Sequence, residues 1–227
     1  MTELSALIFD WDGTLMDSVS KIVGAMRAAA DQVGLEIRSA QEVRDIIGLG
    51  LPEAIATLYP ALHDPSLSVA LAQAYSKQYI RLEETPSPLF DGVVESLTVF
   101  REAGVPLAVA TGKSRRGLDR VLAQHDLVGF FDATRCADET ASKPDPLMLL
   151  QIAEQLKVAP SRSLVLGDSE FDLRMAANAG MRAAAVSFGA QPREHLMRFA
   201  PERCFDDFHD FRGCVSPQLR TCRTAEV

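Results

Sequence analysis

Two aspartates, Asp10 and Asp12, follow an apolar run at residues 4–9, and Asp12 stands directly before Gly13. A short apolar run bounded by a turn signal predicts a buried strand, and carboxylates at its end cost free energy unless they bind something. Residues two apart in an extended chain point to the same side, so both carboxylates can face one pocket. A glycine then lets the chain turn sharply. The stretch predicts an acidic site, although an Asp-Gly turn that only closes a strand has the same pattern.

Thr111, Lys143 and Asp168 also follow apolar segments, and Asp172 lies four residues after Asp168. Ligands of open parallel sheets bind beyond the carboxyl ends of the strands. Carboxylates at helical spacing suit Mg²⁺, whereas a threonine hydroxyl, backbone N–H groups and an ammonium suit phosphoryl oxygens. Each residue alone has an ordinary explanation, as a helix cap for Asp168, a turn hydrogen bond for Thr111 and a solvated loop lysine for Lys143. Together they predict a magnesium site beside a phosphate site.

From residue 91 onward the sequence alternates between helical and strand patterns, which is typical of a parallel sheet with helices on both faces. The predicted fold class is therefore α/β, a doubly wound parallel sheet. The expected helices are 91–104, 114–125, 145–156 and 169–179, and the expected strands after the first are 105–110, 130–134, 163–166 and 182–188. In the first of these helices, Val94, Leu97 and Phe100 are expected to face inward. After Arg203 we expect one short strand, one helix and a frayed end.

Residues 17–86 have only helical patterns. Ser39 followed by Glu42 predicts a capping box at a helix start. A longer helix is expected at 65–84, with its inward side formed by Val69, Ala72, Tyr75, Tyr79 and Leu82. The expected domains are an α/β core made of residues 1–16 and 87–227, and an inserted all-helical domain made of residues 17–86.

The composition narrows the possible functions. The chain has 227 residues, 47% of them hydrophobic, with a net charge of −8, so we expect no nucleic acid partner. No apolar run is long enough to predict a membrane span, and no basic segment precedes an apolar one at the N-terminus, so we expect no secretory signal. The cysteines form no CxxC motif, which favours a reduced, cytoplasmic setting; they are Cys136, Cys204, Cys214 and Cys222.

Four segments in order, 10–14, 111–112, 143–144 and 167–172, resemble the four motifs of the haloacid dehalogenase-like hydrolase superfamily. The resemblance covers about residues 4–189 and includes the helical insertion. That insertion is similar to the cap between the first two motifs in the phosphoglycolate-phosphatase-like branch. The resemblance therefore implies a Rossmann-like core with a cap.

The resemblance also implies roles for the motif residues. Asp10 would be the nucleophile that becomes an aspartyl phosphate. Asp12 would be the general acid and then the base, and its backbone carbonyl would bind Mg²⁺. Thr111, Gly112 and Lys143 would hold the phosphoryl group. The metal ligands would be Asp10, Asp12, Asp168 and Asp172, the last acting directly or through water.

We therefore expect a Mg²⁺-dependent phosphatase of a small phosphorylated metabolite, with phosphoglycolate as the first substrate to consider. A dehalogenase would resemble this pattern without the second acid, Asp12. A phosphotransferase or phosphomutase of the same superfamily is an alternative, but the β-phosphoglucomutase group carries a histidine at the position that is Ile22 here. A non-catalytic phosphoacceptor module of the receiver type also uses an acidic pocket, threonine and lysine, but lacks an acid–base group at the position of Asp12.

We expect the insertion to determine substrate specificity, because the core motifs bind only the phosphate group. Lys21, Arg44 and Gly48 in the insertion, together with Lys113 after the second motif, are the candidate substrate-binding residues. If they bind an anionic tail, phosphorylated acids should be preferred over neutral esters; each also has an ordinary explanation as a surface residue. Both a monomer and a homodimer are compatible with the sequence.

Overall fold

Six parallel strands form one sheet, in the order β3-β2-β1-β4-β5-β6, in the computed structural model, which describes residues 3–219. The strands are β1 (Ala6–Phe9), β2 (Leu107–Thr111), β3 (Ala133–Cys136), β4 (Ser163–Gly167), β5 (Arg182–Val186) and β6 (Cys204–Phe205). The central strand β1 places Phe9 beside Val109 of β2 and Leu166 of β4. Every residue of β1, β2 and β4 is buried, as expected for strands covered on both faces. Their carboxyl ends meet at one edge of the sheet.

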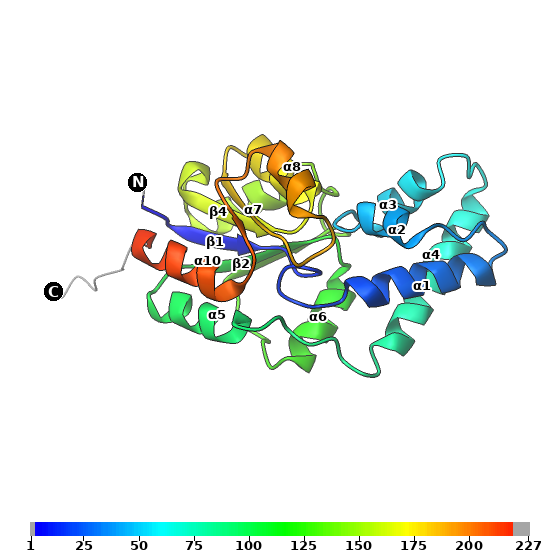
Figure 1. Cartoon of the computed structure of the whole chain (residues 1–227), viewed down its shortest axis with the longest axis horizontal. Helices are drawn as coiled ribbons and strands as arrows, with labels where there is room; N and C mark the ends of the chain where they lie inside the picture. The colour runs from blue at the N-terminus through cyan, green and yellow to red at the C-terminus, as the bar shows by residue number, and fades with distance from the viewer. Residues whose placement is uncertain (1–2, 220–227) are drawn as a thin grey trace.

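Helices cover both faces of the sheet, which confirms the predicted fold class (Figure 1). One face is covered by α5 (Val93–Glu102), α6 (Arg115–Gln124) and α10 (Phe208–Val215), and the other by α7 (Leu147–Leu156) and α8 (Glu170–Asn178). The alternation of a strand decides which side chain meets which layer: Leu7 and Phe9 pack toward α5 and α10, and Ile8 packs toward α7 and α8. The shorter helices are α9 (Arg193–Leu196) and the 3-10 turns Pro160–Arg162, Met197–Phe199 and Ser216–Gln218.

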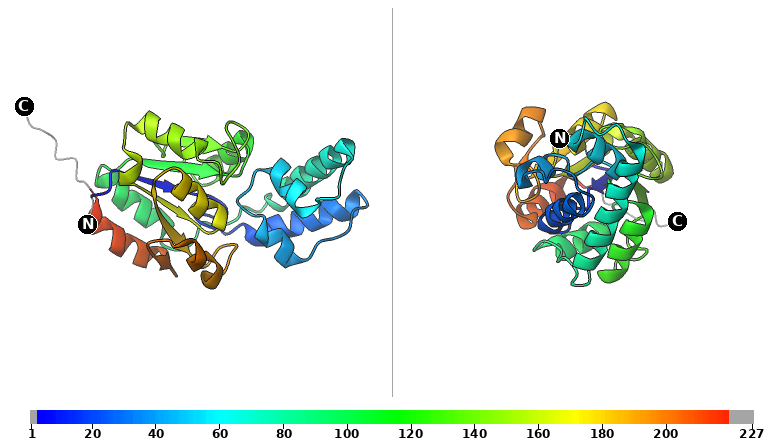
Figure 2. Two further views of the ribbon diagram at one scale, coloured as in Figure 1. Left: turned by 90° about the horizontal axis from the view of Figure 1, so that it is seen from above. Right: turned by 90° about the vertical axis from the view of Figure 1, so that its right-hand side faces the viewer.

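Of the five helices between β1 and β2, the first four form the predicted helical insertion. They are α1 (Val19–Gln32), α2 (Ala40–Asp45), α3 (Leu51–Leu58) and α4 (Pro65–Leu82). The insertion has an apolar core of its own, which includes Met26, Ile55 and Leu71. It projects from the edge of the sheet at which the strands end (Figure 2). Among residues 3–219, no helix combines the length and the apolar character that crossing a membrane would require.

Several local predictions are confirmed. The Ser39 hydroxyl accepts a hydrogen bond from the Glu42 N–H at 3.1 Å, and the Glu42 carboxylate accepts one from the Ser39 N–H at 2.8 Å, which completes the capping box. The short strand and helix expected after Arg203 are β6 and α10. The frayed end and the cysteine at position 222 lie outside the described residues.

Three inward-facing assignments are wrong. Val69 and Leu82 of α4 are 55% and 40% exposed, and Val94 of α5 is 51% exposed. The inward position of Tyr79 in α4 is confirmed, and the other buried residues of this helix are Leu71 and Ala74. Valine and leucine on a solvated helix face are common, so an apolar pattern alone misplaced the buried side of α4.

The third strand is also displaced from its predicted position at 130–134. Phe130 and Phe131 precede it and pack on each other at 5.4 Å between ring centroids. The Asp132 carboxylate accepts a hydrogen bond from the Leu107 N–H at 2.8 Å. These contacts hold the chain in a loop until the strand begins at Ala133.

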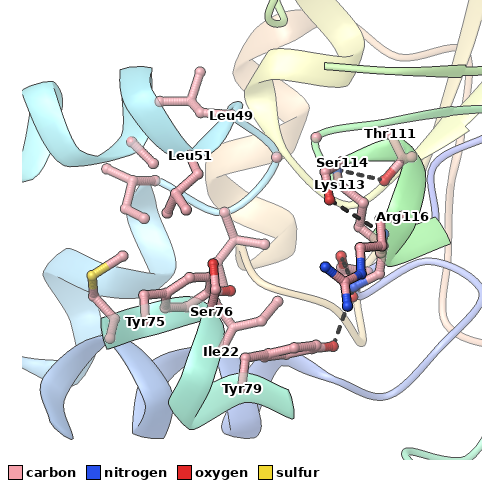
Figure 3. Close-up of a pocket in the computed structure, with 18 of the residues that line it drawn as sticks. Ile22, Leu49, Leu51, Tyr75, Ser76, Tyr79, Thr111, Lys113, Ser114 and Arg116 are labelled. Carbon is pink, nitrogen blue, oxygen red and sulfur yellow. Dashed lines mark hydrogen bonds and ion pairs between the residues drawn. The ribbon is translucent and has the colours of Figure 1, made fainter. Parts of the chain in front are cut away.

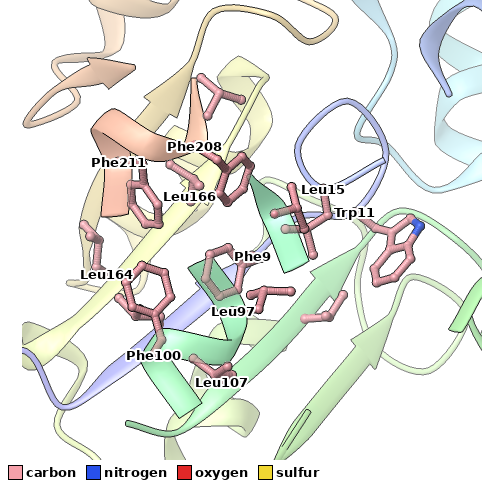
Figure 4. Close-up of a cluster of buried hydrophobic side chains, with 14 of the residues drawn as sticks. Phe9, Trp11, Leu15, Leu97, Phe100, Leu107, Leu164, Leu166, Phe208 and Phe211 are labelled. Atoms are coloured by element: carbon pink, nitrogen blue, oxygen red, sulfur yellow. The ribbon is translucent and has the colours of Figure 1, made fainter. Parts of the chain in front are cut away.

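The helix after β6 completes the larger apolar layer of the core. Phe211 in α10 is fully buried, and its ring lies 6.2 Å from that of Phe9, 5.7 Å from that of Phe100 and 5.3 Å from that of Phe205, each time edge to face (Figure 4). Aromatic pairs in this arrangement add to the free energy gained by burial. The C-terminal helix therefore belongs to the core.

We expect Phe211→Ala to lower the free energy of unfolding by about 3–5 kcal/mol, because it leaves a cavity among packed rings. Urea unfolding followed by circular dichroism measures the change. The matched control is His209→Ala in the same helix, whose side chain is half exposed and whose loss should cost about 0.5 kcal/mol or less. Equal effects of the two substitutions would contradict this assignment of α10 to the core.

Candidate functional site

The predicted chemical residues gather at the carboxyl edge of the sheet. Asp10 follows β1, Thr111 ends β2, Asp168 follows β4, and Asp172 lies in the first turn of α8. Lys143 comes from the loop between β3 and α7. All five are buried, so each must find a partner within the site.

Three of these residues form a carboxylate cluster. Asp10, Asp168 and Asp172 each place one oxygen within 4.8 Å of the oxygens of the other two. Oδ2 of Asp10 is buried without a hydrogen-bond partner. An orphaned carboxylate oxygen beside two other carboxylates fits a hard divalent cation, for which such oxygens are the preferred ligands. These three residues could therefore hold a metal ion.

The ammonium of Lys143 lies within this cluster. Its Nζ is 2.7 Å from Oδ1 of Asp10 and 2.6 Å from Oδ1 of Asp172, and the lysine side chain is fully buried. The explanation of Lys143 as a solvated loop residue is therefore wrong. Three ionised carboxylates and one ammonium leave two uncompensated negative charges, which a divalent cation would neutralise.

Burial shifts the pKa values of the cluster. Removal from water raises the pKa of Asp10 to about 7, against the attraction of Lys143 and with the added repulsion of Asp172. The same desolvation, with the charges of Asp10 and Asp172, raises the pKa of Asp168. For Lys143, desolvation works against the charged form, but the attraction of Asp10 and Asp172 outweighs it and raises the pKa. The lysine therefore stays charged, and a cation that binds Asp10 and Asp168 must compete with protons, because the pKa values of these two carboxyls are raised.

Backbone and hydroxyl groups fix the orientation of the cluster. Asp168 accepts hydrogen bonds from the Ala190 N–H at 2.6 Å and from the Thr14 hydroxyl at 3.3 Å. Asp172 accepts hydrogen bonds from the N–H and the hydroxyl of Ser169, at 3.2 Å and 2.6 Å. Ser169 is the N-cap of α8, so the explanation of Asp168 as the cap of that helix is wrong and its carboxylate is left for the site.

A glycine at position 13 lets the turn after β1 approach the cluster. Its φ of +80° is unfavourable for residues with a side chain, and a Cβ there would collide with the carboxylate of Asp168. The Asp-Gly pattern is therefore a turn, and the turn also serves the site.

Asp12 stands apart from the carboxylate cluster. Its Oδ1 accepts a hydrogen bond from the Ser18 hydroxyl at 2.6 Å, and its Oδ2 lies 2.9 Å from the Nζ of Lys113. The same Nζ donates to the Tyr79 hydroxyl of α4 at 3.2 Å. The sequence did not predict Ser18 or Tyr79 as partners of this acid, since neither lies within the motif that contains Asp12.

A cavity of about 330 Å³ separates the sheet edge from the insertion, and both Asp10 and Asp12 line it. Thr111, Gly112 and Lys113 line its core side (Figure 3). The Thr111 hydroxyl accepts a hydrogen bond from the Lys113 N–H at 3.2 Å, so the ordinary explanation of this threonine in a turn also holds.

The candidate substrate residues separate into two groups. Gly48 and Lys113 line the cavity, whereas Lys21 and Arg44 are not among the described residues that line it. The Nζ of Lys21 instead pairs with Glu83 at 3.0 Å. A Cβ at Gly112 would lie 2.7 Å from the carbonyl oxygen of Gly48, so a glycine at this position lets the insertion come close to the core.

Comparison with known proteins finds the same family that the four sequence motifs resemble. The family model described as haloacid dehalogenase-like hydrolase matches residues 7–186. A protein of Vibrio cholerae named phosphoglycolate phosphatase is 31% identical over 215 residues, which cover 91% of this chain and 95% of the relative. A protein of Pseudomonas aeruginosa named N-acetylmuramic acid 6-phosphate phosphatase is 32% identical over 190 residues, covering 82% of this chain and 83% of the relative.

Among solved structures, a hydrolase from Pseudomonas syringae superposes with a TM-score of 0.87 at 22% identity. The superposition covers 95% of this chain and all of that one. At this level of identity the likeness concerns the fold, including the sheet and the helical insertion.

We expect Mg²⁺ to raise the Tm of the protein, and to raise it less at about pH 6 than at about pH 8. Asp10, with its pKa of about 7, is protonated at the lower pH, and the cation must then displace that proton. A thermal shift series in Mg²⁺ at both pH values measures this. Asp168→Asn should remove most of the shift, and Asp91→Asn, whose side chain is 99% exposed, should keep it. An equal shift in both variants would exclude the cluster as the metal site.

Proposed function

The chain belongs to the haloacid dehalogenase-like hydrolase family, and on this premise we propose that it is a Mg²⁺-dependent phosphatase of a small phosphorylated metabolite. The observation that carries the proposal is the separation of its two motif aspartates. Asp10 lies in a buried carboxylate cluster with Lys143, whereas Asp12 lies outside that cluster with Ser18 and Lys113. Both line one cavity, so one carboxylate can attack while the other handles protons.

Asp10 is the proposed nucleophile. One oxygen of its carboxylate would attack phosphorus in line with the leaving alcohol, form an aspartyl phosphate and release the alcohol, while the other oxygen would remain available to the metal ion. The Nζ of Lys143 would offset the charge of the transferred group, and the Thr111 hydroxyl with the N–H of Gly112 would donate hydrogen bonds to its oxygens. Mg²⁺ held by Asp10, Asp168 and Asp172, with the backbone carbonyl of Asp12, would supply electrostatic stabilisation of the phosphoryl group.

Asp12 is the proposed general acid and base. It would give a proton to the oxygen of the leaving alcohol and then take one from the water that hydrolyses the aspartyl phosphate. Its hydrogen bond from Ser18 and its ion pair with Lys113 hold the carboxylate beside the cavity. A non-catalytic phosphoacceptor module has no need for such a group, and this favours the enzyme over that alternative.

The insertion is the proposed cap. We propose residues 17–86 as the cap domain and residues 1–16 with 87–227 as the core. The contact of Tyr79 in α4 with Lys113 in the core supports a cap that covers the site and excludes water during the reaction.

The names of the relatives do not define one substrate. The two relatives are 31% and 32% identical to this chain and carry the names of different phosphatases, one for phosphoglycolate and one for N-acetylmuramic acid 6-phosphate. Both named substrates are phosphate monoesters, which supports the reaction class. Phosphoglycolate is a reasonable first compound for a panel of phosphate esters in which released phosphate is measured.

We expect Asp10→Asn to lower kcat by at least about a thousandfold, because an amide is not a nucleophile for phosphorus. Phosphate release from the panel of esters measures the loss, and circular dichroism checks that the fold is kept. Asp91→Asn serves as the control for loss of an exposed carboxylate. If Asp10→Asn keeps more than about a tenth of the wild-type rate, the nucleophile is another residue.

We expect Asp12→Asn to release about one equivalent of nitrophenolate from p-nitrophenyl phosphate in a burst and then to turn over slowly. Nitrophenolate leaves without a proton, but hydrolysis of the aspartyl phosphate needs the base. Intact-protein mass spectrometry should find one added phosphoryl group on Asp12→Asn and none on the double variant with Asp10→Asn. Steady turnover of Asp12→Asn without a burst would show that Asp12 is not the general base.

A further inference from the structure

The wall of the cavity that the cap supplies is apolar and aromatic. Ile22, Met26, Ile46, Leu51, Tyr75 and Tyr79 are among its residues. The rings of Tyr75 and Tyr79 are stacked, with their centroids 5.9 Å apart and their planes at 27°. In Figure 3 these side chains stand opposite Thr111 and Lys113 of the core. The leaving group of a phosphate ester bound at Asp10 would point toward this wall.

None of the described cap residues that line the cavity carries a charge. The positive charges of the lining come from the core, on Lys113, Arg116 and Arg120. Lys113 is already paired with Asp12, and Arg116 is exposed. Arg120 is half-buried, and its Nε has no hydrogen-bond partner, so a carboxylate could gain a cation only on the core side of the cavity. A carboxylate on the leaving group that pointed into the cap wall would lose water and meet only neutral side chains, with no cation on that side to pair with, which is unfavourable.

The size of the cavity also bears on the leaving group. Its volume of about 330 Å³ lies at the lower end of the roughly 300–1,000 Å³ found for pockets that hold drug-sized molecules. A leaving group of two or three heavy atoms would leave much of the apolar wall in contact with water. A ring-sized apolar group would cover it, and burial of that surface is favourable.

On the basis of the proposed phosphatase function, we propose that the substrate is a phosphomonoester whose leaving group has a bulky apolar body, such as an aromatic ring. The body packs against Tyr75, Leu51 and their neighbours in the cap while the phosphoryl group lies at Asp10. Small phosphorylated acids such as phosphoglycolate fill the cavity less well and place a carboxylate against the apolar wall.

A comparison of three esters tests this directly: 2-phenylethyl phosphate, ethyl phosphate and phosphoglycolate. The first two have leaving alcohols of similar acidity, so their difference reports on binding of the ring and not on the ease of bond cleavage. We expect kcat/KM for 2-phenylethyl phosphate to exceed that for each of the others by about tenfold or more. Equal values for all three, or a preference for phosphoglycolate, would overturn the inference and leave the phosphatase function in place.

Two variants test whether the cap wall is responsible for the preference for 2-phenylethyl phosphate. Tyr75→Ala should lower the ratio of kcat/KM for 2-phenylethyl phosphate to that for ethyl phosphate by about fivefold or more. Leu51→Arg, which puts a cation into the cap wall, should raise kcat/KM for phosphoglycolate relative to 2-phenylethyl phosphate. The control is Val69→Ala in the same helix as Tyr75; its side chain is 55% exposed, and both ratios should stay as in the wild type.

The outcomes separate the two proposals. Unchanged ratios in both cap variants contradict the inference even if the wild type prefers the aromatic ester. If Tyr75→Ala does not fold, Leu51→Arg and the wild-type comparison still decide. Failure of the wild type to hydrolyse any of the three esters or p-nitrophenyl phosphate in Mg²⁺ counts against the phosphatase function itself, and the inference falls with it.

Discussion

The site depends on one buried ammonium among three carboxylates. Asp10 and Asp168 follow neighbouring parallel strands whose register places Phe9 beside Leu166, so the sheet itself fixes these two acids close together. Asp172 joins them from the first turn of α8. Like charges at this spacing, removed from water, would repel each other strongly. Lys143 lies between Asp10 and Asp172 and offsets part of this repulsion, and the remainder makes the cluster receptive to a divalent cation.

The same chain segment gives its two aspartates different environments. Trp11, which lies between them, is fully buried, and its ring meets that of Phe131 edge to face. The aspartates on either side are thereby directed toward the cavity. Asp10 is surrounded by carboxylates and an ammonium, whereas Asp12 has a hydroxyl and a lysine that also contacts Tyr79 of the insertion. A difference in partners, and not in residue type, separates the proposed nucleophile from the proposed acid.

The sequence predicted the parts of this arrangement that depend on local pattern. Short apolar runs ending in polar residues placed β1 and β4 correctly, because buried strands of a parallel sheet are continuously apolar. It could not decide whether Asp168 capped α8, since Asp168 and Ser169 are both good caps; only the observed contacts of Ser169 settle this. Nor could it give the inward face of α4, because that helix packs on the insertion and also faces the cavity. Contacts between distant segments, such as Ser18 with Asp12, have no local signal.

The division between core and insertion has a physical basis in what each can offer a ligand. The core presents fixed charges at the sheet edge, which in the proposed function would bind a phosphoryl group irrespective of what is attached to it. The cap presents Tyr75, Leu51 and other apolar side chains, whose contribution grows with the apolar surface that the ligand buries. An apolar leaving group packed against this wall would also exclude water from the carboxylate cluster, and electrostatic interactions are stronger when water is excluded. If the proposed function holds, the surface that contacts the leaving group would thus also strengthen the binding of phosphate by the core.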